Sequence, residues 1–260
     1  MTGTRHDSSP LTLLNMPRPH PASSAVSVAI VVVVALSTLL HAQGRGAPPA
    51  PRTPRESARV DITGYWVSIV SEDWRFRMIT APKGDYPNVP LNAEGKKIAD
   101  AWDPAKDEAS GDRCKAYGAP NIMRVPGRLH ITWDDDTTLK IETDAGMQTR
   151  LLRFNATPPP GVRPQRQGFS SAEWEGRDAL KVVTTALLPG YLQSNGAPHS
   201  GKAVMTEHFD VVKEANGDEW LIVDAIVEDP QYLTRSFIRS THFRKQADAT
   251  GWDPSPCFVK

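Results

Sequence analysis

Short stretches rich in β-branched and aromatic residues recur at regular intervals from Val60 onward. Many of them alternate apolar and polar side chains, which is the period-2 pattern of a strand with one buried face. The sequence therefore predicts a mainly β domain. The expected strands cover residues 60–70, 73–80, 128–133, 138–143, 147–154, 172–176, 179–188, 202–212, 219–227 and 236–243.

The breaks between these stretches have the composition of tight turns. They fall at 134–136, 145–146, 175–178 and 216–218, and the last contains the pair Asn216-Gly217, which favours a hairpin. Strands joined by tight turns pair with their sequence neighbours, so we expect a single antiparallel up-and-down β-barrel. A β-sandwich is the alternative that the same pattern leaves open.

One long segment, from Pro82 to Pro126, is rich in proline and lacks the strand pattern. Within it, Asn92–Trp102 predicts one short helix, because Asn92 can cap its start and Pro104 prevents its continuation. Such an excursion either closes one end of the barrel as a lid or plug or lies on the surface, and the sequence leaves both open.

The N-terminal region has the layout of an export signal. An uncharged apolar run covers 25–40, with Arg18 and His20 before it and the small residue Ala42 after it. We predict a signal peptide over 1–42, a disordered Pro- and Ala-rich tether over 43–59, and one barrel domain over 60–260. The expected location is periplasmic or secreted. An uncleaved signal anchor is the alternative, and the only membrane contact expected.

Cys114 and Cys257 are the two cysteines of the chain, and an exported setting favours one disulfide between them. Lys and Arg number 30 and Asp and Glu number 30, so the net charge is zero. This balance gives no basic footprint for nucleic acid or for an anionic membrane surface. No nucleotide, zincin or hydrolase motif is present, and we expect no cofactor.

Gly64-Tyr65-Trp66, at the start of the first expected strand, resembles the Gly-x-Trp signature of the lipocalins. The resemblance covers three residues. It implies an up-and-down barrel with a cavity for a small apolar molecule, in which Trp66 packs against a basic side chain of the last strand, here Arg239 or Arg244.

Alternation along the late strands places charged side chains on apolar faces. Glu207 shares a face with Met205 and Phe209, and Arg239 shares one with Phe237. Glu207 and Arg239 are therefore candidates for an internal ion pair. Arg150 and Arg153 lie on opposite faces of one strand, and if Arg150 points inward it could hold a ligand carboxylate.

The strand histidines do not favour a metal site. A barrel-type site needs imidazoles from several strands that converge, whereas His130 and His208 fall on the faces opposite the apolar residues. The Asp134–Asp136 cluster lacks the ligand spacing of a calcium loop. We predict no metal.

Three functions are consistent with these features. The first is an exported barrel that binds a small, partly apolar molecule. The second is an isomerase, cyclase or lyase on the same barrel that uses Glu207 as acid or base with His208 as partner. The third is a cell-envelope interaction protein with a filled barrel. The ligand-binding residues expected for the first are Trp66, Arg150, Met205, Phe209, Phe237 and Arg239.

Overall fold

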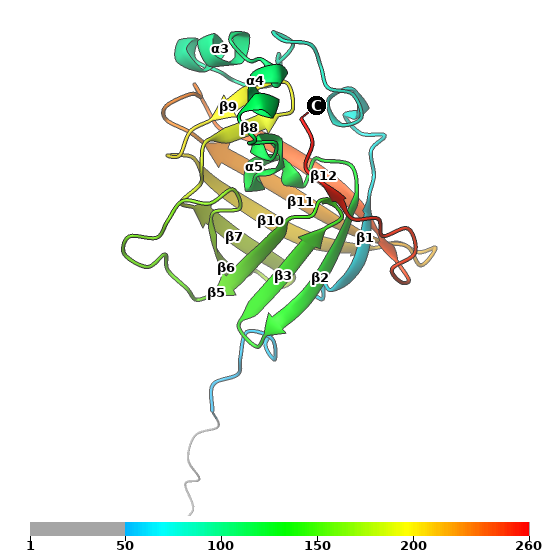
Figure 1. The fold of residues 1–260 in the computed structure, drawn as a ribbon. Coiled ribbons are helices and arrows are strands. Elements are labelled where there is room, and N and C mark those ends of the chain that lie inside the picture. The colour runs from blue at the N-terminus through cyan, green and yellow to red at the C-terminus, as the bar shows by residue number, and fades with distance from the viewer. Residues whose placement is uncertain (1–49, 260) are drawn as a thin grey trace, which may run out of the picture. The chain divides into compact units, whose positions relative to one another are not determined.

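A closed barrel of nine strands dominates the computed structural model, which describes residues 50–259 (Figure 1). The strand order around the barrel is β1-β12-β11-β10-β7-β6-β5-β3-β2. This confirms the predicted all-β barrel and excludes the alternative prediction, a β-sandwich. The barrel strands are β1 Gly64–Ser68, β2 Arg128–Asp135, β3 Thr138–Thr143, β5 Thr149–Phe154, β6 Phe169–Glu175, β7 Ala179–Thr185, β10 Val204–Lys213, β11 Glu219–Glu228 and β12 Phe237–Gln246.

One strand pair departs from the up-and-down pattern. β5 and β6 pair in parallel, whereas the other neighbours in the barrel are antiparallel. Residues 155–168, which contain the run Pro158-Pro159-Pro160, carry the chain back before β6 begins. A parallel pair needs such a long connection, because a tight turn can only reverse the chain.

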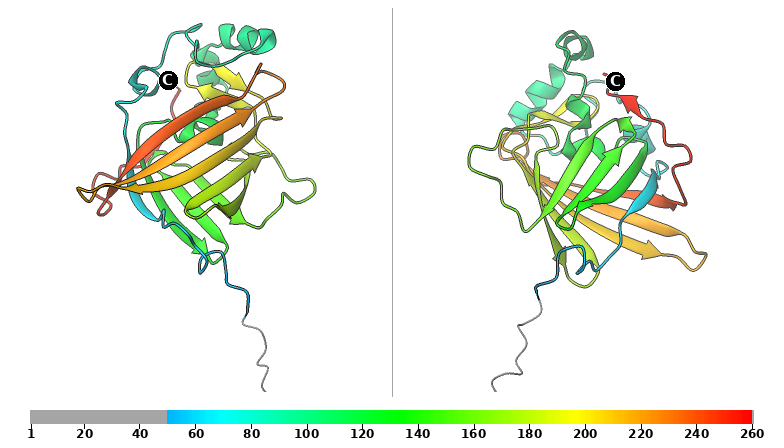
Figure 2. Two further views of the ribbon diagram at one scale, coloured as in Figure 1. Left: turned by 180° about the vertical axis from the view of Figure 1, so that it is seen from behind. Right: turned by 60° about the horizontal axis from the view of Figure 1, so that its bottom comes forward.

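The cap is the group of elements at one end of the barrel, where α3, α4, α5 and the hairpin of β8 and β9 lie together (Figure 1). Figure 2 shows the same end from behind, with one end of each of the long orange strands β11 and β12 lying next to it. The elements outside the barrel are α2 Trp74–Arg77, α3 Ala93–Asp100, α4 Pro104–Ala109, the 3₁₀ turn η1 Lys115–Tyr117, α5 Ala119–Ile122, β4 Ala145–Gly146, β8 Gly190–Gln193, β9 Ala197–His199 and β13 Ser255–Pro256.

The helix predicted over Asn92–Trp102 is present as α3. The side chain of Asn92 accepts a hydrogen bond from the backbone N–H of Gly95 at 2.9 Å, which is the expected N-cap contact. The strand predicted over 73–80 is wrong, because this segment begins with the helical turn α2. Arg77 explains the difference, since its buried guanidinium bonds to the carbonyls of Ile69 and Arg124 and holds the turn in place.

The barrel interior is filled with side chains that alternate along each strand. Ile131, Ile141, Leu152, Leu180 and Phe209 are fully buried members of one apolar cluster inside it. A second apolar cluster joins the end of the barrel to the cap and includes Leu187, Leu192, Met205, Val227 and Phe237. The cap is thus packed onto the strands as part of the core.

Trp66 is fully buried at the start of the barrel, and its indole N–H donates to the carbonyl of Ile62 at 2.9 Å. The ammonium of Lys245 lies 4.6 Å from the centre of the Trp66 ring. The prediction that Arg239 or Arg244 packs against Trp66 is therefore wrong, because Lys245 takes that place. Trp66 and Lys245 are direct partners in the register of β1 and β12, whereas Arg244 projects from the other face.

Cys114 and Cys257 form the predicted disulfide, with their Cα atoms 5.2 Å apart. The bond joins the start of η1 to the segment after β13, which itself pairs in parallel with β4. It therefore ties the C-terminal segment to the cap.

The predicted signal peptide over 1–42 lies outside the described residues, as does the part of the predicted tether before Ala50. Residues 52–259 belong to one compact unit. Within it, the indole N–H of Trp174 donates to the carbonyl of Pro54 at 2.9 Å, and the backbone N–H of Arg55 donates to the carbonyl of Asp136. Among the described residues, no helix has the length and apolar character needed to cross a membrane.

Candidate functional site

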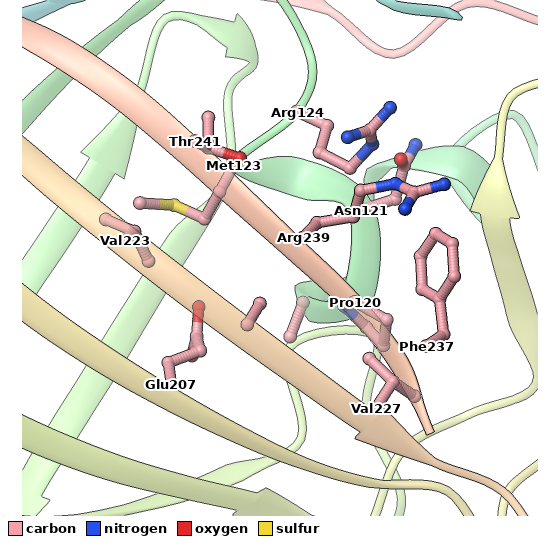
Figure 3. Close-up of a pocket in the computed structure, with 12 residues that line it drawn as sticks. Pro120, Asn121, Met123, Arg124, Glu207, Val223, Val227, Phe237, Arg239 and Thr241 are labelled. Atoms are coloured by element: carbon pink, nitrogen blue, oxygen red, sulfur yellow. The ribbon is translucent and has the colours of Figure 1, made fainter. Parts of the chain in front are cut away.

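Three neighbouring strands supply most of the wall of a small pocket at the capped end of the barrel (Figure 3). Their register places inward-facing residues of β10, β11 and β12 in rows. The central row runs from Glu207 through Ala225 to Arg239. Because alanine has only a methyl group, Ala225 leaves space between the acid and the guanidinium. The flanking rows are Phe209–Val223–Thr241 and Met205–Val227–Phe237.

Helix α5 and the turn after it cover this wall. Pro120, Asn121, Met123 and Arg124 face the strands across the pocket (Figure 3). Pro120 stands in the first turn of α5, where its missing N–H costs no hydrogen bond. The excursion from Pro82 to Pro126 therefore plugs the end of the barrel, which is one of the two outcomes that the sequence left open.

The pocket is small. The space that its lining side chains leave is about 10 Å³, which is room for about one water molecule. Its walls are mixed in character: Met123, Val223, Val227 and Phe237 are apolar, while Asn121, Arg124 and Arg239 bring polar groups to the same space.

Glu207 forms the floor of the pocket and is engaged by Arg150. The two guanidinium NH groups of Arg150 donate to the two carboxylate oxygens at 3.0 and 2.5 Å, and both side chains are fully buried. The hydroxyl of Thr184 lies 3.5 Å from Arg150 and 2.8 Å from the hydroxyl of Ser170. Arg150 therefore points inward, and its guanidinium binds the internal carboxylate of Glu207 instead of a ligand carboxylate.

The expected Glu207–Arg239 ion pair is wrong. Arg239 lies two strands from Glu207, and its guanidinium stacks 4.3 Å from the centre of the Phe237 ring. Its NH groups donate to the carbonyls of Ile238 and Asn88 at 3.0 and 3.2 Å. Arg239 thus turns from the barrel interior toward the rim, which leaves Arg150 as the partner of the acid.

The structure separates the proposed acid–base pair. His208 lies on the outer face of β10, where its Nδ1 is 2.7 Å from Glu175. The other strand histidines also lie outside: His130 stacks on Tyr65, and His242 contacts Glu72. Within residues 50–259, no three His, Cys, Asp or Glu side chains form a group that could hold a metal ion.

The predicted ligand-binding residues divide into two groups. Phe237 and Arg239, together with Glu207, line the pocket. Trp66 and Phe209 pack in the barrel core, Met205 packs in the cluster beneath the cap, and Arg150 lies behind Glu207. Sequence reasoning missed Asn121, Met123 and Arg124, because no periodicity shows where a proline-rich excursion folds back onto the strands.

Arg124 is a deeply buried cation contributed by the plug. Its guanidinium donates to the carboxylate of Asp73 at 2.7 Å, and its backbone carbonyl accepts from Arg77 at 3.1 Å. Burial and then the charge of Arg124 lower the pKa of Arg77 to about 10, and the same two causes lower the pKa of Arg239. The rim of the pocket is therefore cationic.

Comparison of the chain with protein-family models and with curated proteins finds no match in either.

Proposed function

We propose that this chain is an exported, lipocalin-like barrel protein that binds a small, partly apolar molecule in the pocket beneath α5. The observation that carries the proposal is the composition of that pocket, in which the apolar side chains of Met123, Val227 and Phe237 meet the polar groups of Asn121 and Arg239. Apolar walls with a few convergent polar groups are the usual character of small-molecule sites.

Entry of a ligand requires side chains to move, because the present space holds about one water molecule. Ala225 and Arg239 are only half-buried, whereas Phe237 and Val227 are buried. We therefore place the entrance at Arg239, whose side chain leaves the ring of Phe237 as the ligand enters. A step of this kind makes association slower than binding to an open, preformed site.

The binding proposal is tested with N-phenyl-1-naphthylamine, a neutral apolar probe whose emission rises on burial. We expect saturable binding with quenching of tryptophan emission. Ala225→Leu fills the gap between Glu207 and Arg239 and should abolish binding, whereas Ser240→Leu, on the outer face of the neighbouring strand, should not. Absence of saturable binding by the parent chain, or equal binding by both variants, would contradict this site.

Export is part of the same proposal. It is supported by the apolar run over 25–40 and by the Cys114–Cys257 disulfide, which persists in oxidising compartments. Expression of the full chain with a C-terminal tag should yield a shortened, disulfide-bonded product outside the cytoplasm. A full-length, reduced product in the cytoplasm would rule out export.

The geometry does not favour the acid–base alternative. Glu207 is held by two hydrogen bonds to Arg150, and His208 lies on the opposite face of the same strand. A general acid or base must reach the proton that it moves, and these two side chains share no space in which a substrate could lie.

An interaction protein is the second candidate, favoured by exposed apolar side chains around α2. Trp74, Met78 and Ile79 are 56, 55 and 56 % exposed within six positions. Large exposed apolar groups that gather together are typical of contact surfaces. A photo-crosslinking residue at Met78 should then capture a partner in intact cells, while one at Asn216, in the β10–β11 turn, should not. Equal labelling at both positions would remove this candidate.

A further inference from the structure

Two arginines from separate segments, Arg124 and Arg239, line the pocket, and a third, Arg77, contacts the backbone of Arg124. Arg77 belongs to α2, Arg124 follows α5, and Arg239 lies on β12. Arg77 and Arg124 are each 5 % exposed. Arg77 donates from Nε to the carbonyl of Arg124, and, after burial, the positive charge of Arg124 contributes to the lowered pKa of both Arg77 and Arg239. We call these residues the arginine cluster.

The cluster carries more positive charge than its neighbours offset. Within the described part of the chain, Asp73 is the carboxylate that lies within 4.0 Å of a cluster guanidinium, and it contacts Arg124. Glu72, which also acts on Arg77 electrostatically, is engaged by His242. Arg77 and Arg239 bond instead to backbone carbonyls. Buried cations without paired carboxylates are costly, and an anion would offset that cost.

Two donors of the cluster are unused. The Nη2 group of Arg77 and the Nε of Arg239 are buried and donate to no group in the part of the chain that the structure describes. A buried donor without an acceptor costs free energy, so such donors usually indicate a missing partner. An anionic oxygen is the strongest acceptor for a guanidinium.

The backbone at the cluster is also held in an unusual conformation. Asp73, the carboxylate partner of Arg124, has φ +54°, in the left-handed region that residues other than glycine rarely adopt. Backbone strain of this kind persists where the surroundings fix it, often at binding sites. Here it places the Asp73 carboxylate on one side of Arg124.

The cluster adjoins the apolar pocket. Figure 3 shows the guanidinium groups of Arg124 and Arg239 pointing to the same side, next to the amide of Asn121, with the Phe237 ring below them. Arg124 and Arg239 line the same space as Met123, Val223 and Val227. A molecule bound there can place an apolar part against these side chains and an acidic group beside the guanidinium groups of Arg124 and Arg239.

We propose that the ligand is an organic carboxylate, whose acidic group binds the arginine cluster and whose apolar part enters the pocket beneath α5. This inference rests on the proposed function and adds the chemical class of the ligand. Arg239 is the cluster member that meets the ligand first, because it is the half-buried one and its Nε is unused.

The test compares octanoate with 1-octanol, which has the same chain length and no charge. Both are titrated as competitors of N-phenyl-1-naphthylamine and by calorimetry. We expect octanoate to bind at least tenfold more tightly than octanol, since a hydrogen bond to a charged group contributes a factor of about ten or more. Equal affinity would overturn the carboxylate inference and leave the proposed function standing. Failure of both to bind would overturn the proposed function as well.

The role of Arg239 is tested by Arg239→Met, which keeps an unbranched side chain against Phe237 but removes the charge. We expect it to abolish the preference for octanoate while octanol still binds. Arg239→Lys should restore part of the preference through its charge. Arg244→Met is the matched control, because Arg244 lies on the outer face of the same strand and pairs with Asp218. A preference for octanoate that survives Arg239→Met would refute the assignment to this cluster.

Discussion

Arg150 binds both carboxylate oxygens of Glu207 across the interior of the barrel, although β5 and β10 are separated by two other strands. Both side chains are fully buried. The pair therefore joins two parts of the barrel wall that share no backbone hydrogen bonds, and Ser170 and Thr184 extend the polar contacts between them.

Removal of either partner should destabilise the fold strongly. Glu207→Gln leaves the guanidinium of Arg150 buried without a counter-charge. Arg150→Met likewise leaves the carboxylate of Glu207 buried without a counter-charge. Each is expected to lower the free energy of unfolding by about 3–5 kcal/mol. The double variant Arg150→Met/Glu207→Leu should lose less than the sum of the two, as measured by urea unfolding with tryptophan fluorescence. Strictly additive losses would show that the pair is not energetically coupled.

The barrel was predictable because alternation and turn composition repeat along the chain. The predicted strand 138–143 has the same bounds as β3. The inward orientation of the Glu207 side chain follows from its alternation with the apolar neighbours Met205 and Phe209. The partner of Glu207 was not predictable, because the choice between Arg150 and Arg239 depends on how the strands close around the interior. The hairpin of β8 and β9 was missed as well, since its residues are buried in the cap without a period-2 pattern.

The site shows the same division. Phe237 and Arg239 were identified from β12, whose alternation is regular. Arg77 and Arg124 were not, because they come from irregular segments that tertiary contacts hold in place. Arg77 stands in the stretch that the aromatic and β-branched residues of 73–80 predicted as a strand, and its bonds to backbone carbonyls outweigh that local preference.

The Cys114–Cys257 disulfide should contribute substantially to stability, because it joins residues 143 positions apart. Restriction of so long a loop in the unfolded chain predicts a loss of about 2–5 kcal/mol on removal. The double variant Cys114→Ser/Cys257→Ser and the parent chain in reductant should unfold at the same lower urea concentration. Added reductant should leave the variant unchanged, and equal midpoints for the oxidised parent and the variant would contradict the prediction.

A glycine in the cap gives a further test of packing. Gly196, between β8 and β9, has φ +85°, and a Cβ there would lie 2.1 Å from the Cγ of Trp102. Gly217, in the β10–β11 turn, has φ +89° but no atom within 4 Å of such a Cβ. Gly217→Ala should therefore cost only the backbone strain, about 1–2 kcal/mol. Gly196→Ala should cost distinctly more in thermal or urea unfolding, and equal losses would show that the cap yields easily around Trp102.

His199 should make the protein less stable in mild acid. It is 1 % exposed, and burial lowers its pKa from 6.5 to about 4, although the nearby Ser200 carbonyl opposes the shift. Between these two values the unfolded chain binds a proton that the folded chain does not, so stability falls as the pH falls from about 6.5 toward 4. The contribution of this residue to that loss is about 3 kcal/mol. His199→Gln should flatten the dependence of the unfolding free energy on pH in this range. An identical pH profile for His199→Gln and the parent chain would show that another group causes the acid sensitivity.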